Sequence, residues 1–298
     1  MGTHRERRAP DIMDFLRPEA WEDALTVMVE RPSTVPIQGG TSVMVGLNLD
    51  LNRPTALLDL NPVTELTRWE QLENGTLRVG AGVPYARLIS ELGDRLPALA
   101  QAARTIGSSQ IRNRGTVGGN LGAASGDTHA PLLAMGAVIE VESSARGARM
   151  IPATEFFLGA KRNALAPDEL IRAFHVAPAS GPQYFSKIGK RNAMVAATCS
   201  FSIALFPGER RVGTGLGSAA PSPRRALAAE DFLAAELDWD GALDGAVART
   251  FGNLVAEAAD PVDDVRATAQ YRRHALSVIA RRALTWAWQD HANNGKAA

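Results

Sequence analysis

Two glycine-rich segments carry the residues best suited to chemistry in this chain of 298 residues. Residues 36–43 read Pro-Ile-Gln-Gly-Gly-Thr-Ser-Val and residues 116–120 read Thr-Val-Gly-Gly-Asn, about eighty residues further on. Each segment places a Gly-Gly pair beside a hydroxyl residue. Because glycine tolerates φ > 0 and has no Cβ, successive backbone N–H groups can point into one concavity and bind an anion. Two such segments suggest a ligand with two phosphates that is held from both sides.

Neither segment has the form of a common nucleotide-binding motif. They lack the strand–GxGxxG–helix pattern of a Rossmann site and the Lys-Ser/Thr ending of a P-loop. Taken alone, each is open to interpretation as a turn between two elements. The second segment has a distinctive context, since Gln-Ile-Arg-Asn-Arg-Gly precedes it and small or polar residues continue to residue 128. Glycines lose much chain entropy when they become ordered, so a segment this rich in small and polar residues favours a functional site over a simple connecting loop.

Composition narrows the class of protein. The chain is 45% hydrophobic and 21% charged, as in soluble globular proteins, and 298 residues suffice for two domains. Lys+Arg and Asp+Glu number 32 each, so no global field favours nucleic acid or an anionic membrane. The polar start at residues 5–8 lacks the apolar core of a signal peptide, and no apolar run is long enough to span a bilayer. A single cysteine excludes an internal disulfide and a cysteine-ligated iron–sulfur cluster within this chain. We expect a cytoplasmic protein.

The elements that would position the glycine segments alternate between short strands and helices. Apolar spacing predicts helices over residues 18–28, 85–92, 131–135 and 264–288, and strands over residues 56–60, 77–81, 137–141 and 196–206. A Pro/Gly/Ala-rich stretch at residues 177–182 is typical of a linker. This interleaving predicts α+β domains.

Residues 110–121, Gln-Ile-Arg-Asn-Arg-Gly-Thr-Val-Gly-Gly-Asn-Leu, are similar to the signature of the FAD-binding (medium) subunit of the molybdenum hydroxylases. That family includes xanthine dehydrogenase and aerobic carbon monoxide dehydrogenase. The Gly-Gly-Thr-Ser run at residues 39–42 matches the family's other flavin-diphosphate loop. Residues 59–61, 213–223 and 265–274 also look like family features, and the resemblance extends from about residue 13 to residue 284.

The resemblance implies an α+β fold with two domains. Residues 1–178 would form a two-lobed FAD-binding domain of the vanillyl-alcohol-oxidase (PCMH) type, with lobes of about 1–62 and 63–178. Residues 179–298 would form a smaller α+β C-terminal domain of the carbon monoxide dehydrogenase flavoprotein type. FAD would lie between the lobes and the C-terminal domain.

The resemblance also implies which residues bind FAD. One side of the diphosphate would meet Ile37, Gln38, Gly39, Gly40, Thr41, Ser42 and Val43. The other side would meet Thr116, Val117, Gly118, Gly119 and Asn120, through backbone amides, the Thr116 hydroxyl and the Asn120 amide. Ile106 matches an apolar contact, Asp127 an acidic residue that hydrogen-bonds the cofactor, and Val195 a residue near the isoalloxazine ring. Relatives often have Ser-Pro-x-x-Asp where this chain has Ser125-Gly126-Asp127, two residues shorter.

Other residues have structural interpretations. Cys199, in an apolar strand, is expected to be a small buried residue, and Tyr184 and Trp69 are expected in the core or an interface. His129, beside Asp127, is the histidine best placed to touch a cofactor. The arginines of the last helical block are expected on a solvated or subunit-facing helix surface: Arg266, Arg272, Arg273, Arg281 and Arg282.

By its resemblance, the chain is an electron-transfer subunit that does not itself activate a substrate. Molybdopterin would be on a large partner subunit and two [2Fe–2S] clusters on a small one, as a dimer of heterotrimers, with NAD⁺ or another compound as electron acceptor. A xanthine dehydrogenase-type enzyme is preferred, while carbon monoxide, aldehyde and N-heterocycle dehydrogenases remain open. A stand-alone flavin oxidoreductase and a non-catalytic assembly protein are the alternatives of other classes.

Overall fold

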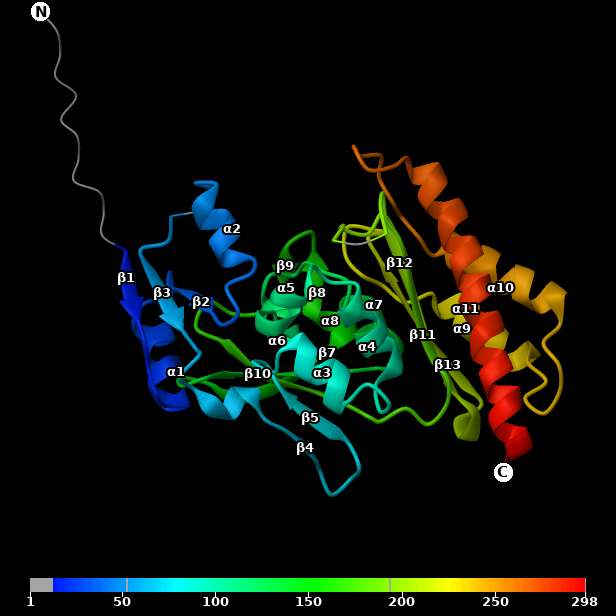
Figure 1. Cartoon of the computed structure of the whole chain (residues 1–298), viewed down its shortest axis with the longest axis horizontal. Coiled ribbons are helices and arrows are strands. Elements are labelled where there is room, and N and C mark those ends of the chain that lie inside the picture. Colours follow the sequence, from blue (N-terminus) through cyan, green and yellow to red (C-terminus); the bar gives the residue numbers. More distant parts are fainter. Residues whose placement is uncertain (1–12, 52, 193, 298) are drawn as a thin grey trace, which may run out of the picture.

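The N-terminal part of the chain forms a small parallel sheet (Figure 1). In the computed structural model, which describes residues 13–51, 53–192 and 194–297, its strands lie in the order β1-β3-β2. The strand bounds are Asp14–Leu16 for β1, Val35–Ile37 for β2 and Ala56–Asp59 for β3. Helix α1, Trp21–Glu30, buries Trp21, Ala24, Leu25 and Met28, which confirms the predicted apolar face. Helix α2, Val43–Asn48, buries no residue. The polar start at residues 5–8 lies outside the described residues.

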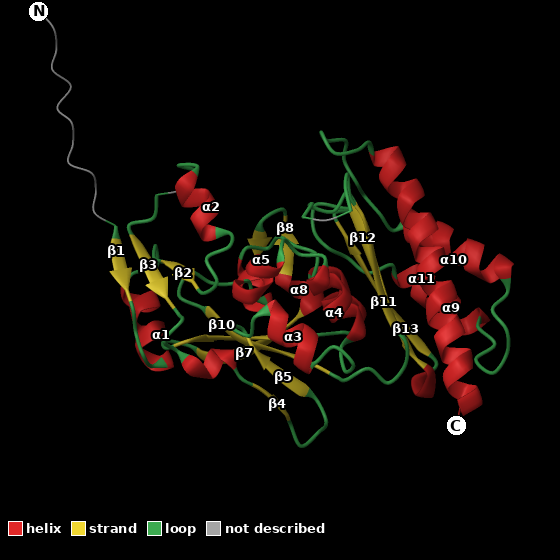
Figure 2. Cartoon of the chain, in the orientation of Figure 1, coloured by secondary structure: helices red, strands yellow, loops and turns green. Residues whose placement is uncertain are grey.

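The middle of the chain forms a five-stranded antiparallel sheet in the order β4-β5-β10-β6-β7. The strand bounds are Trp69–Gln71 for β4, Leu77–Gly80 for β5, Val138–Ser143 for β6, Gly147–Pro152 for β7 and Leu170–Val176 for β10. Helices gather over one face (Figure 2): α3 Tyr85–Glu91, α4 Pro97–Arg104, α5 Ser109–Arg114, α6 Val117–Gly122, α7 His129–Ala134 and α8 Ala153–Phe156. A 3₁₀ turn, Thr64–Thr67, precedes β4, and strands β8 Phe157–Gly159 and β9 Arg162–Asn163 pair beside α8.

Ion pairs and one tryptophan connect α1 with the five-stranded sheet. Trp21 donates from Nε1 to Glu142 Oε2 at 2.8 Å, and Arg172 lies over the Trp21 ring at 5.6 Å. Arg172 also pairs with Glu142 at 2.6 Å. Because these groups come from α1, β6 and β10, they hold the N-terminal part against the sheet.

The C-terminal part contains a three-stranded antiparallel sheet with helices on both faces. Its strands are β11 Gln183–Ile188, β12 Cys199–Phe206 and β13 Arg211–Gly217, with a 3₁₀ turn at Pro207–Glu209. Helices α9 Leu227–Glu236, α10 Gly245–Glu257 and α11 Ala269–Ala297 cover one face, while α4 and α7 lie against the other (Figure 1). This explains why every residue of β12 is buried.

Two glycines of β13 allow the two parts of the chain to pack closely. A Cβ on Gly213 or Gly215 would overlap the carbonyl oxygen of Ala134 or Ala130 on α7. Any larger residue would therefore push α7 away from the sheet. The glycine-rich stretch near residue 213 is thus a strand at an interdomain contact.

The α+β prediction is confirmed, and each predicted strand and helix has a counterpart with shifted bounds. The last helix begins at Ala269, later than the predicted residue 264, and continues to Ala297. The boundary placed at residue 178 falls between β10 and β11 and stays a prediction. Among the described residues, no helix has the length and hydropathy to cross a membrane.

Candidate functional site

The first glycine segment forms a half-buried loop between β2 and α2. Within the described part of the chain, no group accepts a hydrogen bond from the backbone N–H groups of residues 38–43. The loop is fixed by other bonds: Asn61 Nδ2 donates to the Gln38 carbonyl at 2.9 Å, and Met44 N donates to the Gly40 carbonyl at 3.0 Å. Gly40 adopts φ 73°, which favours glycine. Half-buried amides of this kind need partners, and a bound anion would supply them.

Gly39 brings this loop against the segment that leads into the second glycine pair. A Cβ on Gly39 would overlap the carbonyl oxygen of Arg114, the last residue of α5. Arg114 Nη2 also donates to Asn61 Oδ1 at 3.3 Å. The structure therefore brings the two glycine segments together, although about eighty residues separate them in the sequence.

The second glycine segment is the first turn of α6. Thr116 is its N-cap, and the Thr116 hydroxyl accepts a hydrogen bond from Gly119 N at 2.9 Å. Gly118 N donates to the Ala81 carbonyl at 3.2 Å, and Asn120 N donates to the Thr116 carbonyl at 3.1 Å. These groups are thus engaged within the chain, whereas the sequence analysis expects them to face a ligand. Gly118 is needed because a Cβ there would lie 2.5 Å from the Ala81 carbonyl oxygen, while Gly119 is exposed.

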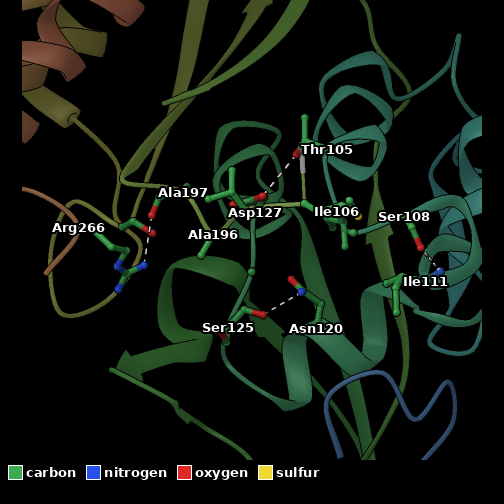
Figure 3. A pocket seen from close by; sticks show the side chains of 15 residues that line it. Thr105, Ile106, Ser108, Ile111, Asn120, Ser125, Asp127, Ala196, Ala197 and Arg266 are labelled. Carbon is green, nitrogen blue, oxygen red and sulfur yellow. Dashed lines mark hydrogen bonds between the residues drawn. The ribbon is translucent and has the colours of Figure 1, made fainter. Parts of the chain in front are cut away.

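A cavity of about 440 Å³ lies beside α6 and crosses the contact between the two parts of the chain (Figure 3). Four residues predicted from the sequence line it together: Ile106, Asn120, Asp127 and Val195. The lining also includes Thr105 and Ser108 after α4, and Ala196, Ala197 and Arg266 from the C-terminal part. Residues 37–43 and 116–119 do not line this cavity.

Asn120 organises the loop that carries Asp127. Its Nδ2 donates to the Ser125 carbonyl at 2.8 Å, and its Oδ1 accepts from the Thr128 hydroxyl at 2.6 Å. Gly126 has φ 148°, and a Cβ there would overlap the Asn120 side chain. The shortened loop therefore depends on Gly126 and still places Asp127 at the cavity.

Lys187 is a residue of the site that the sequence analysis missed. Its Nζ lies 2.6 Å from Asp127 Oδ2 and also donates to the carbonyls of Thr105 at 3.2 Å and Val195 at 3.1 Å. The Lys187 and Asp127 side chains are only 11% and 12% exposed. Since Lys187 is on β11, this ion pair joins the C-terminal part to the loop after α6. A single lysine in a strand gives no sequence signal of such a role.

Two of the arginines expected on a solvated or subunit-facing helix surface have other surroundings. Arg266 precedes α11, donates to the Ala197 carbonyl at 3.3 Å and lines the cavity. Arg272 is 4% exposed and bonds Asp264 at 2.5 Å, which holds the pKa of Asp264 well below its usual range. The prediction is wrong for Arg272, which is buried, because periodicity cannot show that it bonds Asp264. Arg266 is exposed, as expected, but lies before the helix and not on it. The other three, Arg273, Arg281 and Arg282, are exposed.

His129 and Cys199 are buried away from the cavity. The His129 ring packs on Phe157 with centroids 4.2 Å apart, and its Nε2 donates to the Asn120 carbonyl at 3.3 Å. Burial lowers the pKa of His129 to about 4 and raises the pKa of Cys199 to about 12. These surroundings give His129 a packing role and fit the expectation that Cys199 is a small buried residue.

His129 should make the fold sensitive to acid. Below its ordinary pKa of about 6.5, the unfolded chain binds a proton that the folded chain binds only near pH 4, so stability falls as pH falls through this window. Between about pH 7.5 and about pH 5, the unfolding free energy of the His129→Gln variant should therefore fall by about 2 kcal/mol less than that of the wild type. Urea unfolding of both proteins at the two pH values measures it. Equal pH dependence would refute this assignment.

The structure thus combines a loop with unpartnered backbone N–H groups and a cavity at the contact between two parts of the chain, an arrangement that suits the binding of a cofactor. The chain matches the family model described as FAD binding domain in molybdopterin dehydrogenase over residues 11–179, and that described as CO dehydrogenase flavoprotein C-terminal domain over residues 185–287. The chain belongs to the FAD-binding subunits of the molybdenum hydroxylase family.

Individual relatives cover nearly the whole chain. The caffeine dehydrogenase subunit beta of Pseudomonas sp. (strain CBB1) is 30% identical, over 92% of this chain and 94% of its own length. The xanthine dehydrogenase FAD-binding subunit of Escherichia coli O157:H7 is 29% identical, over 92% and 96%. A structure of carbon monoxide dehydrogenase from Hydrogenophaga pseudoflava, lacking the Mo-pyranopterin moiety of its cofactor, matches with a TM-score of 0.85 and 28% identity, over 95% and 99%.

Proposed function

We propose that this chain holds FAD in an electron-transfer complex, with the diphosphate against both glycine segments and the ring system in the cavity of Figure 3. When bound, FAD would supply the redox chemistry by accepting electrons and releasing them to a separate acceptor. The observation that carries the proposal is the run of N–H groups at residues 38–43 without a partner among the described residues. The chain's own role is to bind and orient the cofactor and to keep water from it.

The first glycine loop suits a diphosphate because it offers backbone donors. Strand β2 ends at Ile37, and the loop follows directly. Its backbone N–H groups can bind an anion without the help of a positively charged side chain. They belong to Gln38, Gly39, Gly40, Thr41, Ser42 and Val43. Gln38 Oε1 is buried and has no hydrogen-bond donor among the described residues, so it can accept a bond from a ligand hydroxyl. Residues 116–120 contribute chiefly by shape: Thr116, Val117 and Gly118 are buried and leave Gly119 and Asn120 at the surface.

Asp127 gives the cavity an acceptor for the cofactor. Lys187 bonds Asp127 Oδ2, and no described residue donates to Oδ1, which leaves that oxygen to accept a hydrogen bond from the cofactor. Ile106 and Val195 supply apolar walls on either side of the domain contact, as a planar ring requires. With domains at residues 1–178 and 179–298, the cofactor would lie at the contact between them.

The substrate chemistry is assigned to partner subunits. We place molybdopterin on a large subunit and two [2Fe–2S] clusters on a small one, in a cytoplasmic dimer of heterotrimers that delivers electrons to NAD⁺ or another acceptor. The single cysteine here, Cys199, is buried, so thiolate ligands must come from another chain. A xanthine dehydrogenase-type complex is favoured by the match to a xanthine dehydrogenase subunit, and the match to a caffeine dehydrogenase subunit supports an N-heterocycle dehydrogenase as the second candidate.

Co-purification tests this assignment of roles. The chain, tagged and expressed with its genomic neighbours, should bring down one larger and one smaller chain. Metal analysis should find about one molybdenum atom and about four iron atoms for each FAD, because each small subunit would hold two [2Fe–2S] clusters. A chain that purifies alone with FAD and oxidises an organic substrate would instead be a stand-alone flavin oxidoreductase.

A further inference from the structure

A guanidinium reaches the cavity of Figure 3 from the segment between α10 and α11, residues 258–268. Arg266 lines the cavity on the side of the C-terminal part, and its Nη1 donates to the Ala197 carbonyl at 3.3 Å. Among the described lining residues, only Arg266 and Asp127 are charged. The charge that a ligand meets in this cavity therefore depends on how well their neighbours neutralise each of the two.

Asp127 is neutralised within the chain. Lys187 Nζ lies 2.6 Å from Asp127 Oδ2, and both side chains are largely buried. Opposite charges this close together largely cancel at longer range, so the pair adds little field to the rest of the cavity. Asp127 thus offers the cofactor an acceptor oxygen without offsetting the charge of Arg266.

Arg266 is neutralised only in part. Its Nε lies 3.2 Å from Asp264 Oδ2, but Asp264 Oδ1 lies 2.5 Å from Arg272 Nη2, so one carboxylate serves two guanidiniums. No other carboxylate in the described part of the chain forms an ion pair with either arginine. Lys190 adds a third cation, since its Nζ donates to the Val265 carbonyl at 2.6 Å. This wall of the cavity therefore carries net positive charge.

The same contacts fix the position of the Arg266 guanidinium. The backbone N of Arg266 donates to Asp264 Oδ1 at 2.8 Å, while Nε and Nη1 are bonded to Asp264 and Ala197. Nη2 donates to no described residue, which leaves a donor for a ligand in the cavity. A donor held in place beforehand stabilises a developing charge without reorganisation.

We propose that Arg266 stabilises the negative charge that the flavin ring carries once it is reduced, and so raises the tendency of bound FAD to accept electrons. The inference rests on the proposed function, which places the ring in this cavity. A flavin that takes up two electrons, with one proton at N5, holds one negative charge over N1 and the C2 carbonyl oxygen. The Arg266 guanidinium can donate to these two acceptors, and its charge favours the reduced ring over the neutral oxidised one. In the proposed complex, the electrons come from the iron–sulfur clusters of the small subunit.

Anaerobic reduction of the full-length, FAD-loaded chain by dithionite, in equilibrium with a dye of known potential, tests this role. At alkaline pH, Arg266→Gln should shift the equilibrium about tenfold toward oxidised FAD, a potential about 30 mV lower than that of the wild type. Arg266→Lys keeps the charge and should keep most of the wild-type potential. Arg273→Gln is the matched control and should leave the potential unchanged, since Arg273 is exposed on α11 and does not line the cavity.

The pH dependence of the potential separates charge from packing. At acid pH, where N1 of the reduced ring is protonated and the ring is neutral, Arg266→Gln and the wild type should have equal potentials. Equal potentials at alkaline pH as well would overturn the proposal, and so would a difference of the same size at every pH, which would indicate altered packing. Loss of FAD from Arg266→Gln would make Arg266 a binding residue instead. A wild-type chain without flavin absorbance would contradict the proposed function itself, before any reduction is measured.

Discussion

Gly39→Ala should yield a folded chain that has lost most of its FAD. The new Cβ would overlap the Arg114 carbonyl oxygen, so the first glycine loop must move away from α5. Such overpacking costs about 1–3 kcal/mol, and here it falls on the loop that presents the amides of residues 38–43. We expect FAD affinity to fall at least about tenfold, measured as flavin absorbance after reconstitution with a fixed excess of FAD.

Gly208→Ala is the matched control for this substitution. Gly208 lies in a 3₁₀ turn of the C-terminal part, and a Cβ there meets no atom within 4 Å. The control should retain FAD, and circular dichroism should show that both variants are folded. If Gly39→Ala binds FAD as the control does, the first glycine loop does not hold the diphosphate.

Lys187→Met should destabilise the chain by about 3 kcal/mol, because it leaves the Asp127 carboxylate buried without its cation. The same change frees Asp127 to rotate away from the cavity, so FAD affinity should fall as well. Thermal unfolding should show a midpoint lower by roughly 5–10 °C.

The double variant Lys187→Met/Asp127→Asn distinguishes the ion pair from simple loss of packing. It removes both charges and keeps the shape of the side chains, so it should recover much of the stability lost in Lys187→Met. The single variant Asp127→Asn completes the comparison: if the double variant loses as much stability as Lys187→Met and Asp127→Asn together, Lys187 and Asp127 do not act as a pair.

The sequence predicted much of the fold because short-range signals were strong. The apolar spacing of residues 18–28 found α1, and the apolar runs near residues 57 and 139 found β3 and β6. The strand β13 carries three glycines in seven residues, a composition typical of loops. Its contact with α7 explains Gly213 and Gly215, and the Ser200 side chain of β12 explains Gly217.

The candidate site was predicted in part. Ile106, Asn120, Asp127 and Val195 were expected together and do line one cavity. Sequence reasoning did not show that the second glycine pair opens a helix, because Gly-Gly is a loop signal and the Thr116 cap is one hydroxyl. The role of Lys187 and the place of Arg266 at the cavity were missed because their partners, Asp127 and Ala197, come from distant segments, and contacts between distant segments leave no local pattern.

The central claim is that this chain binds FAD, and the flavin content of the purified chain tests it most directly. After reconstitution and removal of free cofactor, the visible spectrum and the protein concentration should give one FAD per chain. A chain that folds, as judged by circular dichroism, and yet shows no flavin absorbance after the same treatment would contradict the account and favour a non-catalytic assembly protein.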